Sequence, residues 1–546
     1  MKVLMESFFP VWHRFEAECQ ELMLTAPDGV KLFTRVFYPD GQSKGPVTVI
    51  RTPYETAGPL PELCNGWLAD QVEAGFIVVK QHCRGCGASE GDCVPYHNER
   101  EDGLALLDWI RQQPFYDGEI YLAGGSYLAS VHFSYLNAAG DDIKGAVLDV
   151  QDCNRYNILY RNGFFKCGLH GSWAVTMYKK NRQIKKNYTH DSFRTFPLSA
   201  FSQAVFGEKR TFLDEEFSHP DPADPFWDTP AGGGDYKTAL DNLKFPVLFI
   251  TSFYDIYTEG VFDMWERLSP EIRSKCALVV TPYSHAYLGT QNNVIDYANG
   301  SLDTMWPHFR TQWFRAVRSG EKPSFVTLGN ITWHAQHEGV WRTAPHLTDG
   351  DKKLCFTLND HTLDCEAGEE KAITYTYNPY APADFKGGCC NNFDGQQLQD
   401  PPDSRYDILS FVSAPLEREI IFQGRSSVTL KVASDCEDTC FYARLSYVNK
   451  DGQCFCLRDD IISLRSQHPD YTPGTAVEVQ LNFAPNAFKL VPGERLRVDV
   501  SSSCWRYFLP HRNKIGNAWE METAAIARNT VFTGSSTLTL AERSEK

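Results

Sequence analysis

A serine between small residues is the strongest candidate for a nucleophile. Ser126 lies in Ile120-Tyr-Leu-Ala-Gly-Gly-Ser-Tyr-Leu-Ala129, where an apolar run leads into a glycine turn and then into residues able to form a helix. A serine on a tight strand-to-helix turn projects its hydroxyl above the sheet, and small neighbours relieve the strained backbone. The elbow pattern G-x-S-x-G is matched at Gly124, whereas Leu128 occupies its last glycine position. The segment favours a nucleophile, and the simpler alternative is a turn that closes an α/β unit.

Two later segments supply the partners that a hydroxyl nucleophile needs. Apolar runs at 246–250 and 277–280 are followed closely by Asp255 and His285. A serine requires a general base, and the base requires a carboxylate that fixes its tautomer. Open α/β sheets place their sites beyond the carboxyl ends of the strands, and α/β-hydrolases present these residues in the order Ser, Asp, His. We therefore predict a catalytic triad of Ser126, His285 and Asp255.

These positions require a mainly parallel sheet. Short apolar runs bounded by turn residues are typical of buried strands, and a periodic apolar face over 98–111 predicts a helix between two of them. The strand, helix, strand order favours an α/β fold. The predicted strands are 46–50, 76–79, 120–123, 146–150, 246–250 and 277–280.

The texture of the chain changes twice. Residues 152–236 are rich in aromatics and lysine and interrupt the sheet, which indicates an inserted helical cap. The sheet then resumes and is followed by a helical stretch around 301–318. In the tail, short strands are separated by Gly, Pro and Asp turns, which is typical of a sandwich or jelly roll. We predict an α/β-hydrolase fold in two parts, 1–151 and 237–349, which are separated by a helical cap at 152–236. A C-terminal β-domain follows at 350–546.

Five short motifs follow one another along the chain: Arg51-Thr-Pro-Tyr54, Arg84-Gly-Cys-Gly-Ala-Ser-Glu-Gly91, Gly124-Gly-Ser-Tyr-Leu-Ala129, Phe253-Tyr-Asp255 and Pro282-Tyr-Ser-His285. In this order they resemble the CocE/NonD hydrolases, the serine hydrolase group of cocaine esterases and Xaa-Pro dipeptidyl-peptidases. In the tail, 407–416 and 492–503 resemble that family's jelly roll.

The resemblance implies roles for individual residues. Ser126 would be acylated, His285 would act as base and then acid, and Asp255 would orient it. The oxyanion would lie between the backbone N–H of Tyr127 and the phenol of Tyr54. By position, Trp173 and Tyr257 resemble substrate-pocket residues.

Two departures from the family pattern stand near these motifs. His82 replaces an acidic residue before Cys83-Arg84, and Ala129 replaces a glycine after the nucleophile. We expect the first to alter an ion pair around Arg84 and the second to crowd the helix slightly against the sheet.

Composition excludes several other classes. The 53 Lys+Arg against 69 Asp+Glu give a net charge of −16, which disfavours nucleic acid and anionic membranes as partners. Seventeen scattered cysteines, with no signal-like or membrane-spanning run, favour a cytoplasmic protein with reduced thiols. Cys83-x-x-Cys86 lacks the second ligand pair of a structural zinc site. The dinucleotide-like glycine loop at 85–91 should open directly into a helix, but Pro95 interrupts the segment that follows it. We expect no metal and no cofactor.

The function predicted from these features is hydrolysis of small-molecule carboxylic esters through an acyl-enzyme. The first alternative is an amide or peptide hydrolase of the Xaa-Pro dipeptidyl-peptidase or α-amino-acid ester hydrolase type. It ranks second because no clear acidic cluster is evident for a substrate ammonium group, for which Asp152, Asp214, Glu215 and Glu216 remain candidates. The second alternative is a catalytically silent protein that binds a ligand or assembles through its β-domain. A homo-oligomer is left open.

Overall fold

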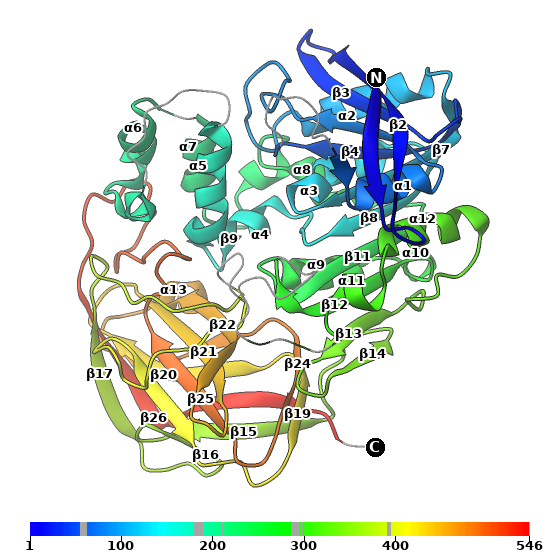
Figure 1. Cartoon of the computed structure of the whole chain (residues 1–546). Coiled ribbons are helices and arrows are strands. Elements are labelled where there is room, and N and C mark those ends of the chain that lie inside the picture. Colours follow the sequence, from blue (N-terminus) through cyan, green and yellow to red (C-terminus); the bar gives the residue numbers. More distant parts are fainter. Residues whose placement is uncertain are drawn as a thin grey trace.

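The computed structural model describes residues 1–54, 63–179, 189–209, 211–285, 295, 297, 299–389 and 395–544. Two large sheets dominate the molecule, and a mainly helical segment lies beside both of them (Figure 1). The first sheet carries the predicted catalytic residues, and the second forms the C-terminal β-region.

The first sheet has twelve strands in the order β14-β13-β12-β11-β8-β7-β4-β6-β3-β2-β1-β5. From β6 to β13 neighbouring strands are parallel, whereas β1, β2, β3 and β14 add antiparallel pairs. The strands are β1 (Lys2–Ser7), β2 (His13–Thr25), β3 (Lys31–Tyr38), β4 (Gly45–Thr52), β5 (Leu63–Asn65), β6 (Ile77–His82), β7 (Tyr116–Gly125), β8 (Ile143–Asp149), β11 (Val247–Tyr254), β12 (Ala277–Ser284), β13 (Ile331–Ala335) and β14 (Val340–Ala344).

Helices cover both faces of this sheet, which explains its apolar central strands. Every residue of β4, β11 and β12 is buried, as expected for parallel strands between two helical layers. Successive residues of β7 point to opposite faces, so Leu122 packs in the cluster that contains α2 and Tyr121 in the cluster that contains α12. The helices of this region are α1 (Trp67–Glu73), α2 (Glu99–Arg111), α3 (Tyr127–Phe133), α9 (Thr258–Arg267), α10 (Pro270–Arg273), α11 (Leu302–Met305) and α12 (Phe309–Ser319), with a 3₁₀ turn at Leu136–Ala138.

The predicted strands and the helix at 98–111 agree with this sheet, but two features differ from expectation. The helical stretch around 301–318 is divided into α11 and α12, because His308 between them adopts a left-handed backbone with φ of 60°. The N-terminal strands β1 to β3 were not predicted. Polar residues alternate with apolar ones along β2, so it lacks the continuous apolar run that marks the central strands.

The segment predicted as a cap is mainly helical and packs with aromatic rings. Phe193 stacks on Phe201 at 4.7 Å between ring centroids, and Phe165 meets Phe217 edge-on at 4.8 Å. These rings therefore form the interior of the cap itself. Its elements are α4 (Arg155–Leu159), β9 (Tyr160–Arg161), β10 (Phe164–Phe165), a π-helical turn (Cys167–Gly171), α5 (Ser172–Lys179), α6 (Phe201–Phe206), α7 (Thr211–Ser218) and α8 (Gly234–Lys237), with 3₁₀ turns at His190–Arg194, Leu198–Ala200 and Pro225–Asp228.

The second sheet forms the C-terminal β-region and curls around its own core (Figure 1). The longest strand, β26, pairs with β15, β17, β19 and β20 and so links its two halves. The elements are β15 (Lys352–Leu358), β16 (Thr362–Asp364), β17 (Lys371–Tyr377), β18 (Leu409–Ser413), β19 (Ile420–Gly424), β20 (Ser427–Ser434), β21 (Cys440–Val448), β22 (Cys454–Ser463), α13 (Leu464–Gln467), β23 (Val477–Asn482), β24 (Asn486–Leu490), β25 (Arg495–Ser501) and β26 (Ala527–Glu542).

The β-region contacts the catalytic sheet directly. The buried guanidinium of Arg458, on β22, donates to the backbone carbonyl of Phe253 near the end of β11. The cap joins the β-region through Arg161 and Asp460, whose side chains pair over 2.9 Å. The Arg458 bond ties the end of β11, which directly precedes Asp255, to the β-region. Across the described ranges, none of the helices has the length and apolar character needed to cross a membrane.

Candidate functional site

Ser126 occupies a strained turn between β7 and α3. Its backbone has φ of 56° and ψ of −130°, and its N–H donates to the carbonyl of Asp149 over 2.9 Å. A β-carbon added to Gly124 would lie 2.2 Å from the carbonyl oxygen of Leu128, so this position requires glycine. The side chain of Leu128, at the last elbow position, packs against the apolar cluster that contains Ala69 and Val72 of α1.

The three residues predicted as a triad lie together beyond the ends of β7, β11 and β12. His285 Nε2 lies 2.9 Å from Ser126 Oγ, and His285 Nδ1 lies 3.0 Å from Asp255 Oδ1. The Asp255 carboxylate also accepts the N–H of Tyr257 over 3.2 Å and a bond from the Thr251 hydroxyl over 3.3 Å. Ser126 can therefore pass a proton to His285, whose other nitrogen faces a fixed carboxylate.

Tyr54 lies against the same serine from the end of β4. Burial of its hydroxyl raises the pKa of Tyr54 to about 12, while the adjacent groups of Ser126, Trp173 and the Tyr127 backbone act in the opposite direction. The residue as a whole is 40% exposed, so the rest of the ring is open to the exterior. The structure thus brings the phenol of Tyr54 and the N–H of Tyr127 to one side of Ser126.

The two predicted pocket residues occupy different places. Trp173, on α5 of the cap, packs against the ring of Tyr127 at 4.9 Å between centroids. Tyr257 meets the ring of His285 at 5.7 Å and also lines a cavity of about 990 Å³ between the cap, α9 and the β-region. Asp152 is buried in the wall of this cavity, and burial raises its pKa to about 6.

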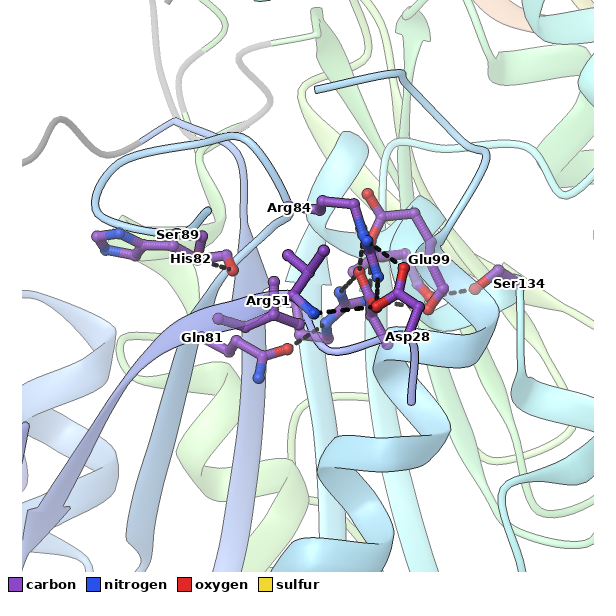
Figure 2. A network of polar contacts seen from close by, with 12 residues as sticks. Asp28, Arg51, Gln81, His82, Arg84, Ser89, Glu99 and Ser134 are labelled. Carbon is purple, nitrogen blue, oxygen red and sulfur yellow. Dashed lines mark hydrogen bonds and ion pairs between the residues drawn. The ribbon is translucent and has the colours of Figure 1, made fainter. Parts of the chain in front are cut away.

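A buried polar network behind the elbow was not predicted (Figure 2). The Tyr127 hydroxyl donates to Glu99 over 2.8 Å, and Glu99 pairs with Arg51 over 2.8 Å. The available sequence signal was an arginine at the end of the apolar run of β4. The partner of this arginine could not be identified from the sequence, because Glu99 lies on a different element, α2.

Arg84 has two carboxylate partners although a histidine stands at position 82. It pairs with Asp102 over 2.7 Å and with Asp28 over 2.6 Å. His82 instead accepts the N–H of Ala88 through Nδ1 over 3.2 Å. The histidine therefore shapes the loop, and the ion pairs of Arg84 form without an acidic side chain at that position.

The described part of the chain contains no group of three or more His, Cys, Asp or Glu side chains arranged to hold a metal ion. Cys83 and Cys86 are buried, and burial raises the pKa of the Cys83 thiol well above its usual range.

Family models match most of the chain. Residues 28–287 match the X-Pro dipeptidyl-peptidase (S15 family) model, and residues 328–539 match the X-Pro dipeptidyl-peptidase C-terminal non-catalytic domain. The second match begins before β13 and β14, which complete the first sheet. The fold and these matches define the protein as a serine hydrolase with an α/β-hydrolase fold and a C-terminal β-rich domain.

Individual relatives agree with this class. Cocaine esterase from Rhodococcus sp. (strain MB1 Bresler) is 25% identical over 88% of this chain and 90% of its own length. An α-amino acid ester hydrolase structure superimposes with a TM-score of 0.79 at 18% identity, covering 96% of this chain and 97% of its own. A CocE/NonD hydrolase from Staphylococcus aureus gives 0.66 at 16% identity, with 98% and 95% coverage. Because the two family models together match most of the chain, it belongs to the X-Pro dipeptidyl-peptidase (S15) family.

Proposed function

We propose that this enzyme hydrolyses carboxylic esters through an acyl-enzyme formed on Ser126. The observation that carries the proposal is the continuous contact of Ser126, His285 and Asp255, with 2.9 Å and 3.0 Å between successive atoms, at a strained elbow. Ser126 Oγ attacks the ester carbonyl carbon while His285 Nε2 takes its proton. His285 then returns the proton to the departing alkoxide, so that an alcohol leaves and Ser126 remains acylated.

Water completes the reaction by the reverse sequence of proton transfers. His285 removes a proton from water, the hydroxide adds to the acyl carbon, and the proton returns to Ser126 as the carboxylic acid leaves. In both halves negative charge develops on the carbonyl oxygen. We assign the phenol of Tyr54 and the N–H of Tyr127 as the donors to that oxygen, because both adjoin Ser126. Burial of the Tyr54 hydroxyl favours its neutral, donating form.

An ester substrate is favoured by the relationship to cocaine esterase, which covers most of both chains. The test is labelling with a fluorophosphonate followed by peptide mapping, together with turnover of a panel of small acyl esters. Modification of Ser126 and its absence in Ser126→Ala are expected. Failure of the native protein to be labelled or to hydrolyse any ester would reject the proposal.

Amide or Xaa-Pro peptide hydrolysis is the second candidate, because the family models describe X-Pro dipeptidyl-peptidases. The same acyl-enzyme chemistry applies, with an amine as the leaving group. Matched ester and amide pairs that share one acyl group separate the two candidates. We expect kcat/KM to favour the ester by more than the intrinsic reactivity of the pair, and a higher kcat/KM for Xaa-Pro amides would make the peptidase assignment correct.

A reducing compartment, the cytoplasm, fits the thiols. The cysteines whose side chains the structure describes form no disulfide with one another, and most of them are buried. Fractionation of cells that express the native chain, with thiol counting in the recovered protein, tests this location.

A further inference from the structure

A buried carboxylate connects the two groups that receive the oxyanion in the proposed function. Glu99, at the start of α2, accepts the hydroxyl of Tyr127 and pairs with Arg51. Tyr127 supplies one donor through its backbone, and Arg51 lies three residues before Tyr54, which supplies the other. We propose that Glu99 is a positioning residue that fixes both oxyanion donors relative to each other. This role rests on the proposed function.

Tyr127 is held at its hydroxyl and on its ring face. The hydroxyl donates to Glu99 Oε1 over 2.8 Å and accepts the N–H of Tyr96 over 2.8 Å. The ring packs against Tyr96 and Trp173 at 5.0 Å and 4.9 Å between centroids. Burial raises the pKa of Tyr127 well above its usual range, so the hydroxyl stays a donor. A side chain fixed in this way restrains the peptide N–H of the same residue.

Arg51 is held by the same carboxylate. Its side chain is fully buried, and its Nη1 lies 2.8 Å from Glu99 Oε2 and 2.9 Å from the Glu99 carbonyl oxygen. Burial alone would lower the pKa of Arg51, but the carboxylates of Glu99 and Asp102 raise it above its usual range. A buried guanidinium without such a partner is strongly disfavoured. Glu99 thus fixes Arg51 at the end of β4.

The connection from Arg51 to Tyr54 is short and internally bonded. The N–H of Tyr54 donates to the Thr52 hydroxyl over 3.2 Å, and the Thr52 carbonyl accepts the N–H of Cys83 over 2.9 Å. A displacement of Arg51 is therefore passed to the backbone that carries Tyr54. Since donors must lie about 2.7 to 3.1 Å from the oxyanion, small shifts at either end reduce the rate.

The outer end of the network supplies a control for a purely structural role. Beyond Arg51 the chain of ion pairs continues through Asp102 and Arg84 to Asp28, whose side chain is 53% exposed (Figure 2). Asp28 does not contact Glu99 or Tyr127 through any bond in this series. Loss of its charge should affect the loop of Arg84 and leave both donors in place.

The experiment compares Glu99→Gln and Tyr127→Phe with the native enzyme. A glutamine offers one acceptor and one donor, so it cannot serve both Arg51 and the Tyr127 hydroxyl as a carboxylate does. Rates are divided by the number of active sites, titrated by the fluorophosphonate burst, so that misfolded enzyme does not count. We expect kcat per site to fall by about 10- to 100-fold, the cost of a shift of up to about 1 Å.

Two further readouts separate positioning from stability. KM should change by less than about threefold, while the affinity for a boronic acid analogue of the tetrahedral intermediate should fall in parallel with kcat/KM. Asp28→Asn and the buried control Asp459→Asn in the β-region should keep kcat per site within about twofold of native, because neither touches an oxyanion donor.

Each outcome is decisive. Native kcat per site in Tyr127→Phe and in Glu99→Gln overturns the positioning role, while native ester turnover leaves the proposed function intact. If Glu99→Gln does not fold, Tyr127→Phe alone decides. The positioning role is also overturned if KM, stability and the number of active sites change together while kcat per site stays at the native value. Absence of labelling and turnover in the native protein rejects the proposed function and this role together.

Discussion

Two trios of arginine, carboxylate and tyrosine are buried in different regions of the molecule. In each, one carboxylate accepts a tyrosine hydroxyl and pairs with an arginine that is 0% exposed, at distances between 2.7 and 2.9 Å. In both regions a carboxylate partner thus offsets the desolvation cost of burying an arginine. The trios are Arg51, Glu99 and Tyr127 in the catalytic region, and Arg444, Asp459 and Tyr442 in the β-region.

The two trios differ in what their members hold. Arg444 donates to the carbonyl of Gly387 over 3.0 Å and to the side chain of Gln399 over 2.9 Å, so the β-region trio fastens a loop to its sheet. In the catalytic region Tyr127 directly follows Ser126, and Arg51 leads to Tyr54. The same three kinds of group therefore stabilise the fold in one place, and in the other we propose that they also set the geometry of the reaction. Rate per active site distinguishes these roles, because stability alone does not change it.

Replacing Ser126 with alanine should have the largest effect. Kcat is expected to fall by about 10⁶, since the nucleophile is lost and the remaining groups only bind and polarise the substrate. Neither trio is touched, so the thermal midpoint should match that of the native enzyme. Steady-state rates and a calorimetric scan on the same preparation check both statements, and a residual rate above about 1% would assign the nucleophile elsewhere.

Replacing Tyr54 with phenylalanine should cost about 10² to 10³ in kcat, the value of one preorganised oxyanion donor. Tyr442→Phe is the matched change in the β-region and should leave kcat per site unchanged. Stopped-flow acylation measured on both variants tests the contrast. Equal rates in Tyr54→Phe and the native enzyme would show that the phenol does not stabilise the oxyanion.

Asp459→Asn should destabilise the protein without slowing it. The buried Arg444 loses its charged partner, and a hydrogen bond to a charged group is worth about 1.5 to 3 kcal/mol. Urea unfolding monitored by tryptophan fluorescence measures the loss, with kcat per titrated site measured in parallel. A rate more than tenfold below native would mean that the β-region trio also acts on the site, for instance through the adjacent Arg458 and its bond to Phe253.

The parallel sheet could be predicted from the sequence because each central strand is a local feature. Runs such as 246–250 are apolar throughout, and their order fixed the edge at which Asp255 and His285 should meet Ser126. The N-terminal hairpin escaped prediction because the exposed half of β2 is polar. Its pairing depends on a neighbouring strand and leaves little trace in its own composition.

The site was predictable only where a residue's role follows from its place at a strand end. Tyr54 was assigned through family resemblance, since nothing in its local sequence distinguishes it from a tyrosine in an ordinary turn. Glu99 was missed altogether: it lies 28 residues from Tyr127 along the chain and meets it only when α2 packs beside α3. Contacts of this kind are set by tertiary packing, which periodicity does not encode.

The smallest expected effect is the pH dependence above pH 9. Tyr54 is the member of the site that is open to the exterior, whereas Tyr127 is 3% exposed, yet burial of the Tyr54 hydroxyl raises its pKa to about 12 from an ordinary value of 10.0. A raised pKa keeps the phenol protonated and able to donate at higher pH, so kcat should stay flat between about pH 9 and 11. Rates per titrated site in this range, for the native enzyme and Tyr54→Phe, check the sign. A tenfold decline in the native enzyme that Tyr54→Phe lacks would place the titration near the ordinary value, and the hydroxyl would then be solvated, unlike the buried hydroxyls of both trios.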